Sequence, residues 1–224
     1  VNIAIANEFS RLADRFGVDI WEAIPLANRH PRVDILNPGP GVGGHCISVD
    51  PWFFVEAAPD LSQLIHTARL VNDTQPNFVV EIMKRHLGTL RNKRIAVLGL
   101  TYKPNVDDFR ESPSLKVIDI LLEAGAEVTA FDPYCKQPSK FNFSLAGSIQ
   151  TALTNIDAAV FLVAHQEFFN LKSFSIDHQK NEKPIIFDAI NLLTPDMLSF
   201  EEYQIIKIGG VNQQMKESSI EDLD

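Results

Sequence analysis

Hydrophobic residues recur at helical spacing from the very start of the chain. Ile5, Phe9, Leu12 and Phe16 fall on one stripe of a helix, and Gly17 is well placed to end it. No capping residue precedes this pattern, so the chain begins within a helix. We therefore expect it to be the C-terminal part of a longer protein.

Further helical segments are predicted before residue 90. Asp19 can cap a second helix through its carboxylate, and Asp50 with Pro51 has the composition of an N-cap and first residue that open a short third helix. A longer pattern ends at Gly88, and Pro76 within it should kink or restart the helix because proline has no amide hydrogen to donate. The first part of the chain is thus predicted to be helical, apart from a glycine-rich loop.

The pattern then changes to short apolar runs that alternate with amphipathic helices. Such alternation is typical of an open, mostly parallel sheet with helices on its faces. We predict an α/β fold: a helical dimerisation domain over residues 1–90, then a Rossmann-like open parallel-sheet domain over residues 91–224, frayed over 213–224. The predicted strands cover residues 94–100, 127–132, 158–163, 184–188 and 203–208, and the predicted helices of this part cover 114–124 and 147–154.

The chain is acidic, with a formal net charge of −9 over 224 residues and a pI near 5.1. It has no extended cluster of Lys and Arg, so nucleic acids and anionic membrane surfaces are not expected partners. No stretch approaches the roughly 20 apolar residues of a membrane span, and no secretory leader opens the chain. Cys46 and Cys135 lie far apart and are expected to be reduced, which indicates a cytoplasmic protein.

A glycine-rich stretch between residues 34 and 52 is the most unusual part of the sequence. Positive φ angles and a close backbone approach to a ligand are possible at its four glycines, Gly39, Gly41, Gly43 and Gly44. Cys46 follows them, next to His45 and near a helix N-terminus, which is the setting of an activated nucleophile for a carbonyl carbon. The alternative is a small buried hydrophobic residue in a turn, and the pattern leaves both open.

Asp50 follows Cys46 by about one helical turn. Its carboxylate can act as a base or orient groups near the thiol, and an aspartate before proline is also ordinary N-cap chemistry worth about 1 kcal/mol. The two roles are compatible. A metal held by His45, Cys46 and Asp50 is disfavoured because no further cysteine or clustered histidine joins them, so we predict no metal site.

Two basic clusters are candidates for binding an anion. His30 and Arg32 lie just before the glycine-rich stretch, where an arginine can bind phosphate or carboxylate, or can be solvated at a helix end. Lys103 and Arg110 lie in the loop after the first strand, at the edge where parallel sheets usually bind ligands. Neighbouring acidic residues can instead be salt-bridge partners of these two cations.

The same loop lacks the pattern Gly-x-Gly-x-x-Gly, so it is not expected to be the main dinucleotide site. Asp132 follows the second strand, where a ribose-binding acid often lies. Without the glycines it does not by itself indicate a dinucleotide.

Two long motifs carry a resemblance to a known family. Residues 38–53 read PGPGVGGHCISVDPWF, and residues 99–113 read GLTYKPNVDDFRESP. Together with the preceding Asn-Arg-His-Pro-Arg, they resemble the UDP-glucose/GDP-mannose dehydrogenase family over residues 1 to about 190. The resemblance implies three domains: one for NAD, a central helical one that forms a homodimer, and a C-terminal one that binds the UDP-sugar. This chain resembles the last two and lacks the NAD domain.

The resemblance also implies an activity and a set of site residues. The family oxidises the C6 alcohol of a nucleotide sugar to a carboxylate with two NAD, while a cysteine holds the aldehyde as a thiohemiacetal and then as a thioester. For this chain it implies UDP-N-acetyl-D-mannosamine as substrate, with UDP-N-acetylglucosamine as an epimer that no motif excludes. The matching positions are Cys46 and Asp50 for catalysis, His30, Arg32, Gly43, Tyr102 and Lys103 for the substrate, and Arg110 for NAD.

Two departures from the family pattern affect these expectations. The family's Lys-x-x-x-Asn, which includes its catalytic lysine, would precede Val1. Ile190 and Asn191 stand where relatives often have a basic residue near the nucleotide. We therefore expect the isolated chain to be inactive, as a nucleotide-sugar-binding and dimerisation module. A divergent homologue in which Cys46 is only structural is a further possibility, which the reactivity of the thiol would decide.

Overall fold

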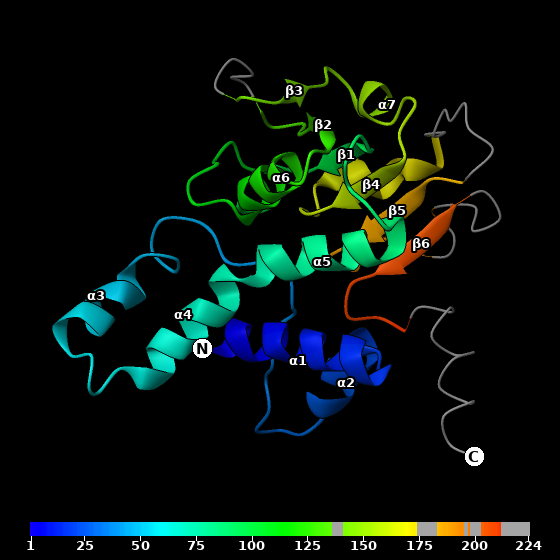
Figure 1. The fold of residues 1–224 in the computed structure, drawn as a ribbon. Helices are drawn as coiled ribbons and strands as arrows, with labels where there is room; N and C mark the ends of the chain where they lie inside the picture. Colours follow the sequence, from blue (N-terminus) through cyan, green and yellow to red (C-terminus); the bar gives the residue numbers. More distant parts are fainter. Residues whose placement is uncertain (136–140, 174–182, 195–196, 198–202, 212–224) are drawn as a thin grey trace.

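The computed structural model describes residues 1–135, 141–173, 183–194, 197 and 203–211. A parallel sheet forms the core of the part that follows residue 90, and helices α1 to α4 lie to one side of it (Figure 1). The strand order is β3-β2-β1-β4-β5-β6, and every paired neighbour runs parallel. The predicted α/β class with an open parallel sheet is therefore confirmed. The frayed terminus predicted over 213–224 lies outside the described residues. The strands are β1 (Arg94–Leu98), β2 (Glu127–Phe131), β3 (Ser144–Leu145), β4 (Ala158–Phe161), β5 (Ile185–Asp188) and β6 (Gln204–Lys207).

The helices lie close to their predicted positions. Gly17 ends the first helix in the left-handed conformation, with φ 66°, and its amide bonds to the carbonyl of Ala13. Pro76 lies in the first turn of a new helix that restarts after Thr74, as predicted. The helices are α1 (Asn2–Phe16), α2 (Ile20–Ala27), α3 (Asp50–Ala57), α4 (Gln63–Asp73), α5 (Gln75–Leu87), α6 (Pro113–Glu123) and α7 (Ile149–Ala152), with a 3-10 helix η2 (Gln166–Ser173).

The predicted capping role of Asp50 is wrong by one residue. Val49 is the N-cap of α3, so Asp50 and Pro51 are its first two helical residues. A valine side chain has no oxygen to accept the free amides of the first turn, which leaves this helix start without a side-chain cap. Asp50 is exposed there, at the positive end of the helix dipole.

Apolar side chains cover both faces of the sheet. On one face α5 and α6 pack on the strands, with Val79, Met83 and Val117 fully buried. On the other face α7 and the segment around Phe168 pack on Ala96 and Leu98. Each large apolar side chain buried in this way contributes about 1.5–3 kcal/mol. Although α5 precedes residue 90, its buried residues belong to the core of the sheet.

Helix α1 is attached to the rest of the chain by its small and polar face. Asn7, Ser10 and Asp14 are buried, and Asp14 pairs with Arg85 of α5 at 2.6 Å. The hydrophobic stripe predicted for this helix faces outward instead. The exposed fraction of its four members is 42% for Ile5, 40% for Phe9, 42% for Leu12 and 70% for Phe16. Together with α2, the stripe borders a groove of about 260 Å³.

Helix α2 is joined to the end of the sheet. The indole Nε1 of Trp21 donates to the carbonyl of Ile208 at 3.0 Å, and the amide of Ile20 donates to the carbonyl of Gly209 at 2.9 Å. Gly209 has φ 77°, and a Cβ there would lie 2.7 Å from the Ile20 side chain. The residues after β6 therefore close directly onto the helical part of the chain.

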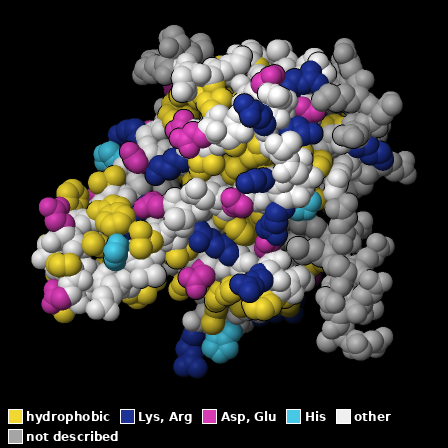
Figure 2. Space-filling model, viewed as in Figure 1, with side chains coloured by type: hydrophobic (Ala, Val, Ile, Leu, Met, Phe, Trp, Pro, Cys, Tyr) yellow, Lys and Arg dark blue, Asp and Glu magenta, His cyan; other side chains and the backbone are white. Residues whose placement is uncertain are grey.

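Helices α3 and α4 form an end that projects from the molecule, and hydrophobic side chains gather on its surface (Figure 2). Phe53, Phe54, Leu61 and Leu64 are 63%, 64%, 83% and 67% exposed. Helix α3 buries none of its residues. Among the described residues, no helix combines the length and the apolar character needed to cross a membrane.

Candidate active site

The glycine-rich stretch packs directly on the loop that follows β1. The amide of Gly44 donates to the carbonyl of Arg110 at 3.0 Å. A Cβ at Gly43 would lie 2.5 Å from the Glu111 carbonyl oxygen and 2.8 Å from the Tyr102 Cβ, and one at Gly44 would meet the Tyr102 ring. At these two positions glycine is required by the approach of two loops to each other, a reason that differs from the predicted approach to a ligand.

Cys46 is exposed at the end of this stretch. Its Sγ lies 3.1 Å from Nδ1 of His45, within hydrogen-bond distance. Its carbonyl accepts the amide of Asp50 at 2.8 Å, so α3 begins within one turn of the thiol. The alternative of a buried hydrophobic cysteine is therefore wrong. Cys135, by comparison, is half-buried.

Cys46 and Asp50 line a common cavity of about 470 Å³. Asn2 of α1 and Arg69 and Asn72 of α4 add polar groups to its wall, while Leu36 and Phe54 add apolar ones. The helical part of the chain thus places a thiol, a carboxylate and amide groups around one space. A cavity of this volume is large enough for a sugar ring.

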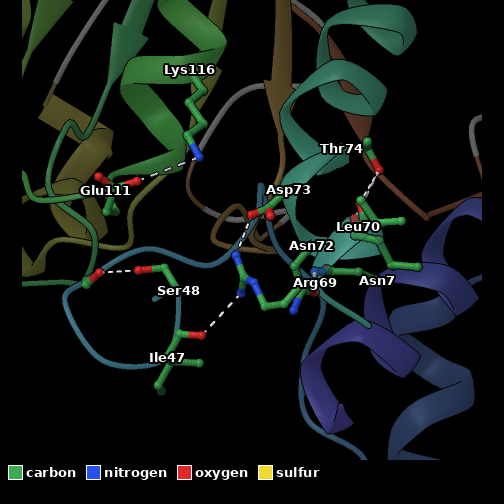
Figure 3. A network of polar contacts seen from close by, with 12 residues as sticks. Asn7, Ile47, Ser48, Arg69, Leu70, Asn72, Asp73, Thr74, Glu111 and Lys116 are labelled. Carbon is green, nitrogen blue, oxygen red and sulfur yellow. Dashed lines mark hydrogen bonds and ion pairs between the residues drawn. The ribbon is translucent and has the colours of Figure 1, made fainter. Parts of the chain in front are cut away.

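Arg69 is a charged residue of this wall that the sequence pattern does not single out. Its side chain is buried, its Nη1 donates to the carbonyl of Ile47 at 3.3 Å, and its Nη2 pairs with Asp73 (Figure 3). Its Nε has no hydrogen-bond partner among the described residues. A buried donor without a partner costs about 1–3 kcal/mol. The arginine therefore ties the residue after Cys46 to α4 at some expense in stability.

Two buried asparagines hold the start of the glycine-rich stretch. Nδ2 of Asn7 donates to Oδ1 of Asn72 at 3.0 Å, and Oδ1 of Asn7 accepts the amide of Gly39 at 2.9 Å (Figure 3). Both side chains are buried between α1 and α4. The stretch is thereby fixed at its beginning by α1 and α4 and at its end by Arg69.

A second cavity, of about 330 Å³, lies between the glycine-rich stretch and the carboxyl edge of the sheet. Pro40 and Gly41 form one wall, and Tyr102, Lys103 and Ile190 belong to the other. Nζ of Lys103 lies 5.5 Å from the centre of the Tyr102 ring, as in a cation–π contact. The stretch from Leu36 to Cys46 lines both cavities, which makes them neighbours.

Comparison with known proteins separates the helical part of the chain from the part that contains the sheet. The central-domain model of the UDP-glucose/GDP-mannose dehydrogenase family matches residues 1–74, and the UDP-binding-domain model of that family matches residues 96–195. The chain belongs to the UDP-glucose/GDP-mannose dehydrogenase family. The resemblance stated from the two motifs is confirmed.

Relatives in this family have similar names. A UDP-N-acetyl-D-mannosamine dehydrogenase of Methanocaldococcus jannaschii is 44% identical over 215 residues, which cover 93% of this chain and 48% of that protein. An NDP-N-acetyl-D-galactosaminuronic acid dehydrogenase of Ralstonia nicotianae is 46% identical over 173 residues, or 76% of this chain and 41% of that protein. The solved structure of the UDP-D-ManNAc dehydrogenase of Pyrococcus horikoshii is 36% identical, with a TM-score of 0.81 over 94% of this chain and 49% of that one. The chain thus spans about half the length of these relatives.

The remaining family positions lie outside both cavities. His30 and Arg32 are exposed in the turn after α2, where Nδ1 of His30 accepts the amide of Arg32 at 3.3 Å, and neither residue lines either cavity. Arg110 is also exposed, and its Nη2 pairs with Oδ2 of Asp108 at 2.6 Å. The hydrogen bonds from Arg110 lower the pKa of Asp108 to about 2. Asp108 is therefore a salt-bridge partner, as the sequence analysis allowed.

Ile190 and Asn191 have a basic neighbour in space. Nζ of Lys207, on β6, donates to Oδ1 of Asn191 at 2.7 Å. The family pattern predicts a basic residue at the position of Ile190 or Asn191. In the structure, the cation near this position is Lys207, which the parallel pairing of β5 and β6 brings close. No group of three or more His, Cys, Asp and Glu side chains suited to a metal occurs among the described residues.

NAD, which the family implies, does not fit the turn after β1. Gly99 has φ 92°, and a Cβ there would lie 2.6 Å from the Val163 Cβ, so Val163 packs closely against this turn. Asp132 uses one carboxylate oxygen for the amides of Leu100 and Thr101 and the other for the amide of Tyr134. It is engaged with the main chain, which is not the role of a ribose-binding acid. Both observations speak against a main dinucleotide site in this turn, and its absence stays a prediction.

Proposed function

We propose that the protein to which this chain belongs oxidises the C6 alcohol of a UDP-sugar to the uronate, with UDP-N-acetyl-D-mannosamine as substrate and NAD as hydride acceptor. Family membership supports the reaction class, and the names of the relatives support the sugar. UDP-N-acetylglucosamine is the alternative substrate.

One observation carries the proposal. An exposed cysteine thiol lies 3.1 Å from an imidazole nitrogen, in the wall of a cavity that it shares with Asp50. An imidazole at this distance can take up the thiol proton. The thiolate then adds to the C6 carbon of the aldehyde, the π bond of the carbonyl breaks, and its oxygen takes the proton back from the imidazole to give a thiohemiacetal.

Hydrolysis returns the thiol. Once the thiohemiacetal has been oxidised to a thioester, water adds to its carbonyl carbon, and the bond from sulfur to carbon breaks to release the carboxylate and Cys46. Asp50 lines the same cavity, and its carboxylate is the base that we assign to this water. NAD supplies the hydride acceptor for both oxidations, and in this proposal it is held outside the chain described here.

The nucleotide end of the substrate is assigned to the second cavity. The UDP-binding-domain model spans its residues Tyr102, Lys103 and Ile190. Lys103 provides a cation for the diphosphate, and Tyr102 provides an aromatic face. With the sugar in the Cys46 cavity, the substrate would run along the glycine-rich stretch, past Gly43. Arg110 remains a candidate contact to NAD, in competition with Asp108.

We infer a homodimer from the outward face of α1. Its hydrophobic stripe is exposed beside an apolar groove of about 260 Å³, and a second copy of the chain would bury both. His30 and Arg32 project from the turn that follows α2, so they are candidates to reach the substrate of the other subunit. A cytoplasmic enzyme is consistent with Cys46 and Cys135 not being joined in a disulfide.

A second function is favoured for the isolated chain. Val163 packs closely against the turn after β1, and Asp132 is bonded there to the main chain, so the 224-residue polypeptide alone is assigned a nucleotide-sugar-binding and dimerisation role. It should bind UDP without reducing NAD.

The test uses the complete protein that contains this chain. Cys46→Ser should abolish formation of the uronate from UDP-N-acetyl-D-mannosamine and NAD, whereas Cys135→Ser should keep the wild-type rate. Full turnover by Cys46→Ser would sink the mechanism. A higher kcat/KM with UDP-N-acetylglucosamine would transfer the proposal to the alternative sugar. NADH formation by the isolated chain would refute the assignment of a binding module.

A further inference from the structure

His165 is a fully buried histidine behind the wall of the second cavity. It lies in the turn after β4, and its exposed fraction is 0%. Its ring stacks on Tyr134 at 5.1 Å between centres and meets Phe168 edge-on at 5.4 Å. The side chain does not line the cavity, although the preceding residue, Ala164, does. Any effect of His165 on a ligand must therefore pass through other residues.

The hydrogen bonds of the ring fix its tautomer. The amide of Asn105 donates to Nδ1 of His165 at 3.1 Å, so Nδ1 carries no proton. Nε2 must then carry the proton, and it lies 3.0 Å from Oδ2 of Asp132, to which it donates. Both ring nitrogens of a neutral histidine are thus used, one as acceptor from a loop amide and one as donor to a carboxylate.

These bonds hold the loop after β1 on both sides of Tyr102 and Lys103. Before them, the amides of Leu100 and Thr101 donate to Oδ2 of Asp132 at 2.6 and 3.1 Å. After them, the amide of Asn105 is held by His165. The hydroxyl of Thr101 closes the turn by donating to the carbonyl of Lys103 at 2.9 Å.

Asn105 has a backbone conformation that needs such support. Its φ is 61°, in the left-handed region that a residue with a side chain adopts at a cost. Its Oδ1 accepts the amide of Gln166, the residue after His165, at 3.0 Å. The loop and the turn after β4 therefore exchange two hydrogen bonds from main-chain amides, one in each direction, and the hydroxyl of Thr101 also lies 3.3 Å from Nε2 of His165.

We propose that His165, oriented by Asp132, is a positioning residue that holds the 100–105 backbone so that Tyr102 and Lys103 face the nucleotide cavity. The inference rests on the proposed function for the identity of the ligand, and on the hydrogen bonds alone for the position of the loop. A histidine without such a role would be exchangeable for any residue that fills its space.

Two variants separate the two ring nitrogens. His165→Asn places an amide oxygen near the position of Nδ1 and keeps an acceptor for Asn105. His165→Gln extends its amide group to the position of Nε2 and keeps the donor to Asp132, but not the acceptor. Phe168→Leu is the matched control, because it removes packing from the same buried cluster without touching the loop amides.

Two measurements on the complete protein test the proposal. Amide hydrogen exchange at Asn105 should be about five-fold faster or more in His165→Gln and near wild type in His165→Asn and Phe168→Leu, as expected for loss of one hydrogen bond. The KM for the UDP-sugar should rise by a similar factor in His165→Gln, with kcat within about two-fold, and should be restored in His165→Asn.

Equal exchange at Asn105 in both histidine variants would overturn the proposal. So would a rise of KM in Phe168→Leu as large as that in His165→Gln, because the effect would then come from general loss of packing. If the wild-type protein turned over no UDP-sugar, the proposed function would fail, while hydrogen exchange at Asn105 would still decide whether His165 holds the loop.

Discussion

Nη1 of Arg69 donates to the carbonyl oxygen of Ile47 at 3.3 Å, and thereby joins helix α4 to the residue that follows Cys46. The guanidinium is held from its other side by Asp73 (Figure 3). Replacing Arg69 with Met keeps much of the side-chain volume and removes both contacts. Because Asp73 remains partly hydrated, we expect a loss of about 1–2 kcal/mol in the free energy of unfolding. We also expect faster amide exchange at Asp50, which bonds to the Cys46 carbonyl.

Urea unfolding and amide exchange of the variant measure these two effects. Arg85→Met provides the control, since Arg85 is also paired with a carboxylate, that of Asp14, far from Cys46 in the sequence. Unchanged exchange at Asp50 in Arg69→Met would show that Arg69 does not hold the loop.

Cys46 should react with iodoacetamide faster than Cys135 does, because it is exposed and has an imidazole nitrogen 3.1 Å from its sulfur. His45→Ala removes that imidazole and should slow alkylation of Cys46 several-fold at pH 7. Mass spectrometry of tryptic peptides gives the two rates separately. Equal rates at the two cysteines in the wild type would favour a purely structural Cys46.

Gly43 and Gly39 form a matched pair for substitution by alanine. A Cβ at Gly43 would lie 2.5 Å from a backbone oxygen of Glu111, whereas a Cβ at Gly39 has no neighbour within 4 Å. Gly43→Ala should therefore lower the free energy of unfolding by about 1–3 kcal/mol through overpacking. Gly39→Ala should be nearly neutral. Chemical denaturation of both variants checks this, and equal stability would mean that the two loops separate easily.

Asp132 should contribute to the pH dependence of the free energy of unfolding at acid pH. Burial raises the pKa of this carboxyl, but hydrogen bonds from His165 and the Leu100 amide outweigh it, so the net pKa lies below the ordinary value. A group with a depressed folded pKa stabilises the protein above its unfolded pKa of about 3.9, and this contribution is lost as the pH falls through the folded pKa. Asp132→Asn should flatten the loss of stability below about pH 4.

Asp188 provides the comparison of opposite sign. Burial raises its pKa despite three main-chain hydrogen bonds, so its contribution is present at low pH and is lost as the pH rises through the folded pKa. Urea unfolding of the wild type and of Asp132→Asn between pH 3 and 6 measures the loss of stability at acid pH. A loss that is as steep in Asp132→Asn as in the wild type would contradict the assignment to Asp132.

A charge on the exposed stripe of α1 tests the proposed dimer. Phe9→Asp should convert the dimer to monomers, because an unpaired carboxylate in an apolar interface is costly. Phe169→Asp is the control, since Phe169 is a similarly exposed aromatic residue, at 49% against 40% for Phe9, on η2. Sedimentation velocity distinguishes the two, and a wild type that is already monomeric would rule the dimer out.

The sequence predicted most of the elements because their signals are local. Gly17 and Asp19 stop and start helices through their own backbone and side chain, and Pro76 restarts a helix through its missing amide hydrogen. The two-residue strand β3 is too short to show an alternating pattern, and a cap at Val49 contradicts the preference for oxygen-bearing residues.

Such local patterns do not predict contacts between segments that are distant in the sequence. Arg69 lies on the helix face of Ile65 and Asn72, and its spacing there does not distinguish it from a solvated arginine. The need for glycine at Gly43 depends on Glu111 and Tyr102, which belong to the loop after β1 and are distant from Gly43 in the sequence. The motifs identified the family, whereas the residues that each motif residue contacts are known only from the structure.

The bonds from Ile20 and Trp21 to Gly209 and Ile208 have a consequence for how the protein is made. During synthesis α2 emerges early, but its partners emerge almost two hundred residues later, just after β6. Until then α2 lacks these two bonds to the end of the sheet, although α1 is already held on α5 by the pair of Asp14 and Arg85. Contacts of such long sequence separation form slowly, so we expect docking of α2 to be among the last steps of folding.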